Sequence, residues 1–83
     1  MSELLFGRSW IPDETVLKYR LKGTNDEWQV GKVIDDRKYD EGGEIMHTTM
    51  FMGNDNKTTT ITFSINLSTN GNGSKGTHDI AKC

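Results

Sequence analysis

The chain has 83 residues, 33% of them hydrophobic, and ten basic and twelve acidic residues give it a formal net charge of −2. This length predicts one domain with a thin core, and the near-neutral charge gives no electrostatic preference for nucleic acid or for an anionic membrane. The one cysteine, Cys83, excludes an internal disulfide framework. Because no apolar run has the length of a signal peptide or a membrane span, we expect a cytoplasmic protein without a membrane partner.

The first two predicted strands lie in the N-terminal third of the sequence. Residues 3–11 are β-prone but imperfectly alternating, and Pro12 ends them because proline has no N–H to donate. Residues 15–22 alternate well, as a half-buried strand does. Their apolar face contains Leu17, Tyr19 and Leu21, and their outer face contains the basic residues Lys18, Arg20 and Lys22.

A third strand is predicted at residues 27–34, after a turn at 23–26 whose composition is typical of turns. Trp28 and Val30 share one face, which we assign to the core. Gly31 allows a bulge that would add Val33 to this face; without the bulge Ile34 joins it instead. This strand is expected to pair with residues 15–22 as a hairpin.

Residues 35–44 read as a charged loop, because acidic side chains and two glycines interrupt any alternation. The next strand is predicted at residues 44–52. One of its faces holds methionines, and the other holds Ile45, His47, Thr49 and Phe51. The methionines are flexible gap-fillers in a core or an adaptable binding surface.

The strongest strand pattern lies at residues 58–68, where β-branched and aromatic residues alternate with small polar ones. After it, the composition changes to a glycine- and asparagine-rich segment in which Ile80 is the one large apolar residue. The sequence therefore predicts a β domain at residues 1–68 and a flexible C-terminal tail at 69–83.

These patterns predict an all-β fold, a single small domain of five antiparallel strands in a meander that closes into a small barrel or remains a curved sheet. Connections of this length suit neighbouring antiparallel strands. Apolar side chains from every predicted strand except the first form the predicted core. Its residues are Leu17, Tyr19, Leu21, Trp28, Val30, Phe51, Ile61, Phe63, Ile65 and Leu67.

Two charged features are candidate binding surfaces. The basic row, with Trp28 or Tyr19 nearby, could hold phosphates while an aromatic ring stacks on a base; such rows also protect strand edges from aggregation. The acidic residues of the predicted loop suggest a docking surface for a basic partner, and the alternative is a solvated loop. The candidate residues are Lys18, Arg20, Lys22, Trp28, Asp35, Asp36, Asp40, Glu41 and Glu44.

One face of the 58–68 strand has no charged side chain, which makes it a candidate homodimer interface, since hydroxyls pack without the cost of burying ions. The alternative is an ordinary solvent face. The candidate interface residues are Thr58, Thr60, Thr62, Ser64 and Asn66.

No catalytic, cofactor or metal site is predicted. Gly71, Gly73 and Gly76 match the spacing of a dinucleotide-binding loop, but too few residues follow for the helix and strand that such a loop needs. The two histidines and Cys83 do not have the compact spacing of zinc ligands, and a tail is a poor place for a nucleophilic Cys–His pair.

We therefore predict a non-catalytic, intracellular protein-binding module, comparable in size with adaptor or inhibitor proteins of phages and other mobile elements. The alternative is a binder of a nucleotide-type or other anionic ligand, or of nucleic acid, through the basic row. An enzyme is the least favoured reading, because the sequence offers no activated nucleophile and no convincing acid–base pair.

Overall fold

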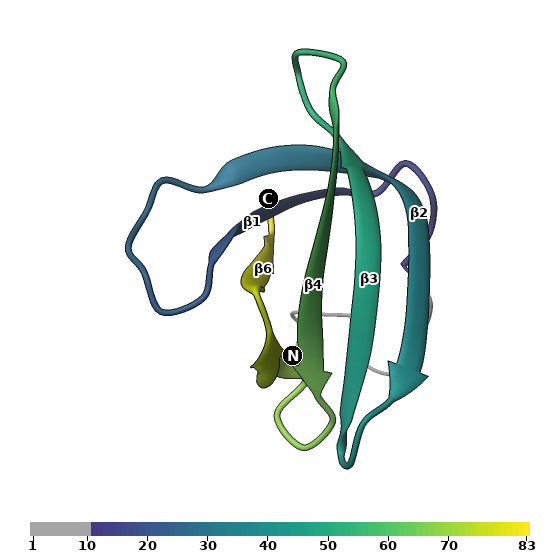
Figure 1. Ribbon diagram of the computed structural model, residues 1–83, viewed down its shortest axis with the longest axis vertical. Helices are drawn as coiled ribbons and strands as arrows, with labels where there is room; N and C mark the ends of the chain where they lie inside the picture. The colour runs from purple at the N-terminus through teal and green to yellow at the C-terminus, as the bar shows by residue number, and fades with distance from the viewer. Residues whose placement is uncertain (1–10) are drawn as a thin grey trace.

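The computed structural model describes residues 11–83, which contain strands and no helix. Six strands form one antiparallel sheet in the order β5-β4-β3-β2-β1-β6 (Figure 1). The all-β class is therefore confirmed, with one strand more than predicted. The strands are β1 (Val16–Leu21), β2 (Gln29–Asp40), β3 (Glu44–Met52), β4 (Thr58–Asn66), β5 (Gly71–Gly76) and β6 (His78–Lys82).

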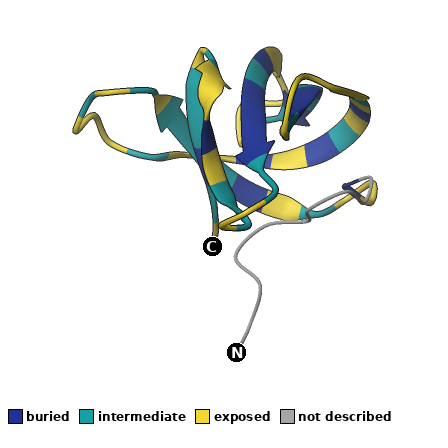
Figure 2. Ribbon diagram, turned by 90° about the horizontal axis from the view of Figure 1, so that it is seen from below, coloured by how far each residue is buried: buried dark blue, intermediate teal, exposed yellow. Residues whose placement is uncertain are grey.

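The sheet curves strongly, so its inner face encloses the core while its outer face is exposed (Figure 2). Phe51, Phe63 and Ile80 have no exposed surface at all. The core cluster joins residues from β1, β2, β3, β4 and β6 with the segment before β1: Ile11, Leu17, Val33, Phe51, Ile61, Phe63, Ile65 and Ile80, with Tyr19 packed against them. The predicted inner face of β4 is confirmed for its three central apolar residues.

The two ends of the sheet are formed by β5 and β6, which are consecutive in the chain. Thr77, between them, donates its N–H to the carbonyl of Thr62 in β4 at 2.9 Å and accepts from the N–H of Lys22 after β1 at 3.0 Å. The side chain of Asn72 bonds both the N–H and the carbonyl of Ile80, each at 2.9 Å. No strand ladder joins β5 to β6, so the sheet is curved and open.

The predicted charged loop at residues 35–44 is wrong, because β2 continues to Asp40 and pairs with β3 as far as Ile45. A bulge between Val33 and Asp35 shifts the register. Charged side chains fit this strand because they alternate between faces and most of them are exposed. Only the turn around Gly42 and Gly43, with φ of 57° and 89°, leaves the sheet.

The predicted flexible tail is also wrong, since its residues form β5 and β6 and bury Ile80. The glycines are needed for close approach here: a Cβ at Gly73 would overlap the side chains of Ser64 and Glu44. Gly76 has φ of 89° and lies against the backbone of Phe63. A composition that is typical of a linker thus belongs to a strand that packs tightly on its neighbour.

Four predicted core residues lie outside the core, and one of them, Leu67, is half-buried and follows the end of β4. Trp28 is half-buried, Val30 is 45% exposed and Leu21 is 49% exposed. On β2 the inner position beside Leu17 belongs to Gly31, where a Cβ would come within 2.8 Å of the Phe51 Cβ. Of the first predicted strand, all but Ile11 lies outside the described residues.

Candidate binding surface

The outer face of β1 and β2 brings together basic, aromatic and aliphatic side chains. Lys18 pairs with Val30 across the two strands, and Val16 pairs with Lys32. Because side chains alternate along each strand, these residues share the face opposite to the buried Leu17. We call this set the β1–β2 outer patch: Val16, Lys18, Arg20, Trp28, Val30 and Lys32.

The indole ring of Trp28 contacts two of the cations of the patch. The Arg20 guanidinium carbon is 4.2 Å from the ring centroid and the Lys18 ammonium nitrogen is 5.1 Å from it. Each such cation–π contact contributes about 0.5–1 kcal/mol at an exposed site. Trp28 thus lies beside two cations of the predicted basic row. Tyr19 instead lies on the inner face and stacks on Phe51 with ring centroids 4.9 Å apart.

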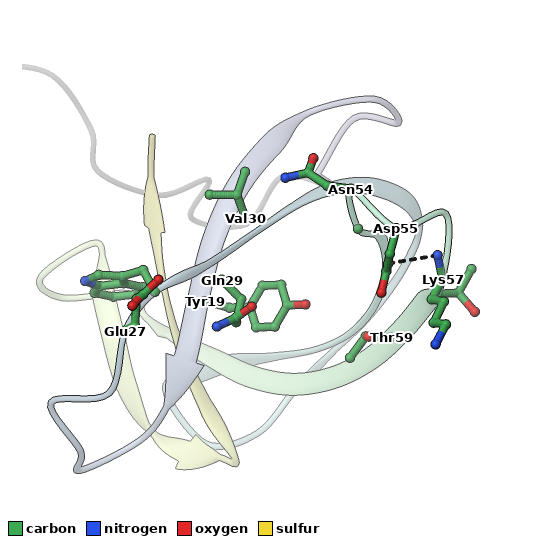
Figure 3. A pocket seen from close by; sticks show the side chains of 11 residues that line it. Tyr19, Glu27, Gln29, Val30, Asn54, Asp55, Lys57 and Thr59 are labelled. Atoms are coloured by element: carbon green, nitrogen blue, oxygen red, sulfur yellow. Dashed lines mark hydrogen bonds between the residues drawn. The ribbon is translucent and has the colours of Figure 1, made fainter.

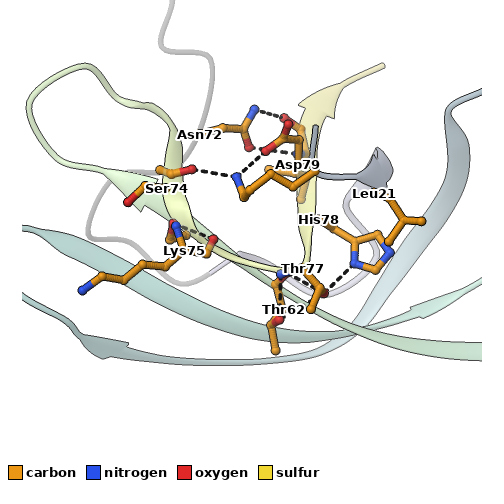
Figure 4. A network of polar contacts seen from close by, with 12 residues as sticks. Leu21, Thr62, Asn72, Ser74, Lys75, Thr77, His78 and Asp79 are labelled. Atoms are coloured by element: carbon orange, nitrogen blue, oxygen red, sulfur yellow. Dashed lines mark hydrogen bonds and ion pairs between the residues drawn. The ribbon is translucent and has the colours of Figure 1, made fainter. Parts of the chain in front are cut away.

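Lys22 does not belong to this patch, so the predicted row of three cations is divided. Its ammonium bonds an Asp79 carboxylate oxygen at 2.6 Å and the Gly73 carbonyl at 2.7 Å. It therefore ties β5 and β6 to the end of β1, in the polar network that also contains Asn72 and Thr77 (Figure 4). Lys22 has a structural role, and its charge is compensated.

The cations of the patch are not compensated in this way. Within residues 11–83, no carboxylate lies within ion-pair distance of Lys18, Arg20 or Lys32. The buried Nε–H of Arg20 also has no hydrogen-bond acceptor in that part of the chain. Val16 and Val30, exposed to 49% and 45%, leave apolar surface between these charges.

The predicted acidic surface is dispersed by the fold. Asp35 lies 3.8 Å from Arg37, Glu41 lies 3.9 Å from Lys75, and Asp40 ends β2. The Glu44 carboxylate accepts hydrogen bonds from the Ser74 N–H at 3.1 Å and the Ser64 hydroxyl at 2.9 Å. These contacts, led by the Ser74 N–H, lower the pKa of Glu44. The acidic residues therefore make separate local contacts and do not form one continuous acidic surface.

Asp36 is buried on the inner side of the sheet with two polar neighbours. Its carboxylate accepts from the His47 Nδ1 at 2.9 Å, the Thr49 hydroxyl at 2.7 Å and the Ile11 N–H at 3.1 Å. Burial alone raises the pKa of Asp36, but the hydrogen bonds and the His47 charge outweigh it and lower the pKa. We call these three side chains the Asp36–His47–Thr49 cluster.

This cluster resembles part of a catalytic constellation only in its residue types. The ring of His47 stacks on Phe63 with centroids 4.9 Å apart, and its Nε2 is buried without a partner in the described chain. The side chains of His47 and Asp36 are 0% and 2% exposed. A substrate in solution does not reach such a ring, so the cluster is a structural element of the core.

The predicted dimer face on β4 is partly covered within the chain. Ser64 is fully buried by β5, and its hydroxyl donates to Glu44 and accepts from the Lys75 N–H at 3.0 Å. Thr62 accepts the Thr77 N–H at 3.1 Å, and Asn66 caps the turn after β4. Thr58 and Thr60 are exposed. Of the five predicted interface residues, Ser64 is therefore inaccessible, whereas Thr62 and Asn66 are half-buried.

Sequence reasoning missed Lys32 as a member of the patch and the whole Asp36–His47–Thr49 cluster. One signal for the cluster was available, since His47 and Thr49 alternate in phase with Ile45 and Phe51, which places them on the inner face. Lys32 could be found only from the register of β1 and β2.

The chain matches no protein-family model, no curated protein and no solved structure. In the described part, no group of three or more histidine, cysteine or acidic side chains could hold a metal ion. That part also has no helix long and apolar enough to cross a membrane.

Proposed function

We propose that the protein is a non-catalytic protein-binding module and that the β1–β2 outer patch is its contact surface. The observation that carries this proposal is Trp28, held beside two cations that have no ion-pair partner within residues 11–83 and next to exposed Val30. Tryptophan and arginine are the side chains that most often dominate binding energy at protein interfaces. Aromatic residues and arginine are also enriched in such interfaces as a whole.

The partner is a protein segment that combines carboxylates with apolar side chains. Lys18, Arg20 and Lys32 supply three positive charges on a chain whose net charge is −2, so the positive potential is local to this patch. A complementary negative segment would associate faster and in a defined register. Val16 and Val30 would contact its apolar side chains.

Nucleic acid is the competing occupant, because cations beside an aromatic ring also suit phosphates and stacked bases. Two observations favour protein. The chain is acidic overall, with a pI of about 5.6, and nucleic-acid-binding domains are typically strongly basic. The Trp28 ring is also already in contact with two cations.

The proposal is tested by affinity capture from the source cell with the wild-type chain and three variants as bait. Trp28→Ala and Lys32→Glu are expected to weaken capture of an acidic protein, Trp28→Ala by about tenfold or more, as for an interface hot spot. Arg37→Glu is the matched control, since it makes the same charge change at an exposed site of β2 outside the patch, and it should retain the partner.

Two outcomes would contradict the proposal. Equal capture by all four baits would place the contact elsewhere on the molecule. Capture that nuclease removes, with affinity falling steeply as salt rises, would identify nucleic acid as the ligand.

A further inference from the structure

A cleft of about 580 Å³ opens beside the β1–β2 outer patch, and its lining combines Trp28 and Val30 of that patch with Tyr19 of the inner face. It lies between the start of β2 and the loop that joins β3 to β4 (Figure 3). This volume is within the range of small-molecule sites, and the mouths of curved or closed sheets are common places for them. We call it the mouth cleft; its aromatic lining consists of Tyr19 and Trp28, and its polar lining includes Glu27, Gln29, Asn54 and Asp55.

The cleft has a fixed aromatic wall. The Tyr19 ring stacks on Phe51 at 4.9 Å between centroids, with the ring planes 27° apart, and Phe51 is fully buried. Figure 3 shows Tyr19 in the middle of the cleft, with Glu27 on one side and Asp55 and Lys57 on the other. Because the core holds Phe51, the tyrosine ring is a preformed flat surface.

The loop on the opposite side is also well held. The Gly53 N–H donates to the Lys57 carbonyl at 2.9 Å, and the Lys57 N–H donates to the Asp55 carboxylate at 3.1 Å. These bonds fix the loop in a compact turn and present Asn54 at the rim. Little conformational entropy is then lost when a ligand enters.

Three polar side chains of the cleft are free to bind a ligand, whereas the Asp55 carboxylate already accepts the Lys57 N–H. In residues 11–83, the side chains of Glu27, Gln29 and Asn54 have no hydrogen-bond partner. A carboxylate accepts hydrogen bonds, whereas each amide both donates and accepts. The carboxylates of Glu27 and Asp55 and the ammonium of Lys57 give the lining a net charge of −1. The lining therefore suits neither a strongly anionic ligand nor a hydrophobic one.

We propose that the mouth cleft binds a neutral polyhydroxylated ligand, a mono- or disaccharide. Sugar hydroxyls both donate and accept, which matches amides and carboxylates placed around one small volume. The C–H groups on the face of a sugar ring carry slight positive charge, and the face of an aromatic ring such as Tyr19 is negative. This inference goes beyond the proposed protein interface, although Trp28 and Val30 belong to the β1–β2 outer patch and also line the cleft.

The test is a titration of the ¹⁵N-labelled full chain with glucose, galactose, mannose, N-acetylglucosamine, maltose and lactose, followed by amide chemical shifts. At least one sugar should give saturable shifts that centre on Tyr19, Gln29 and the loop at 53–57. Gln29→Ala and Asn54→Ala should each weaken that binding about 2–10-fold, the loss expected for one net hydrogen bond. Lys32→Ala, on the outer face, should leave it unchanged.

The absence of saturable shifts with every sugar would overturn the inference, as would shifts that neither cleft variant reduces. Inorganic phosphate that saturates the same amides more tightly than any sugar would also overturn it, in favour of an anionic ligand. The protein interface is judged separately by Lys32→Glu, which should weaken capture of the proposed partner and changes a residue that does not line the cleft, whereas Trp28 lines both sites.

Discussion

At the scale of single residues, the Asp36–His47–Thr49 cluster is the least expected feature of the molecule. Burying a carboxylate costs free energy through lost hydration, and this cost is offset only when its hydrogen bonds are complete. Asp36 meets this condition with three donors from β3 and from the segment before β1. The cluster therefore ties the backbone at Ile11 to the paired strands β2 and β3.

The stability of the protein should depend on the ionisation of Asp36. Its folded-state pKa lies below the ordinary value of 3.8, so its contribution is fully present above that value and is lost as pH falls through the folded-state pKa. Asp36→Asn should lower the free energy of unfolding by about 1–3 kcal/mol at neutral pH. Urea unfolding at a series of pH values should show this difference shrinking in acid.

The neighbouring Asp35 provides the control, because its side chain is 58% exposed. Asp35→Asn should change the free energy of unfolding by less than about 0.5 kcal/mol, as for most surface substitutions. If both variants behaved alike, the hydrogen bonds of Asp36 would not contribute to stability.

At the scale of elements, β5 and β6 complete the core although their composition resembles a linker. Ile80→Ala should lower the free energy of unfolding by about 2–5 kcal/mol, because it removes a fully buried side chain. Leu21→Ala is the matched control, since Leu21 is 49% exposed and most substitutions at exposed sites cost about 0.5 kcal/mol or less. Chemical denaturation measures both. A small loss at Ile80 would show that β6 is not part of the cooperative unit.

Whether a strand could be predicted from the sequence depended on the pattern of its side chains. β3 and β4 were predictable because long alternation leaves one face apolar, and the boundaries of β3 matched the prediction. Trp28 was assigned to the wrong face because Gly31, which lies against Phe51, has no side chain to mark the inner row. The Asp36–His47 contact depends on pairing across two strands after a bulge, and a single sequence does not specify that register.

The candidate surface was predictable only in part. Alternation placed Lys18 and Arg20 on one face of β1, and this was enough to suggest an outer basic row. It did not show that Lys22 turns to Asp79, because that contact joins residues 57 positions apart. Sequence alone therefore could not separate a binding cation from a structural one.

At the scale of the whole molecule, the predicted homodimer remains a prediction with a narrower interface. Thr60→Lys should break a dimer that uses the exposed part of β4 and leave the monomer folded, because Thr60 is exposed. Ser64→Lys should instead destabilise the fold, since Ser64 is fully buried under β5. Light scattering over a dilution series reports the mass, and circular dichroism reports the fold. A wild-type chain that is monomeric at high concentration would contradict the dimer.

The pairing of β1 with β6 also has a consequence for biosynthesis. Leu17 is paired with Lys82, so β1 acquires its second neighbour only after the intervening strands and β6 have been translated. A nascent chain that has not yet reached residue 78 presents the backbone edge of β1 to the cell, and such edges recruit other strands. Stalled or truncated translation products should therefore aggregate, and pairing across so many residues should make folding of the released chain slow for its size.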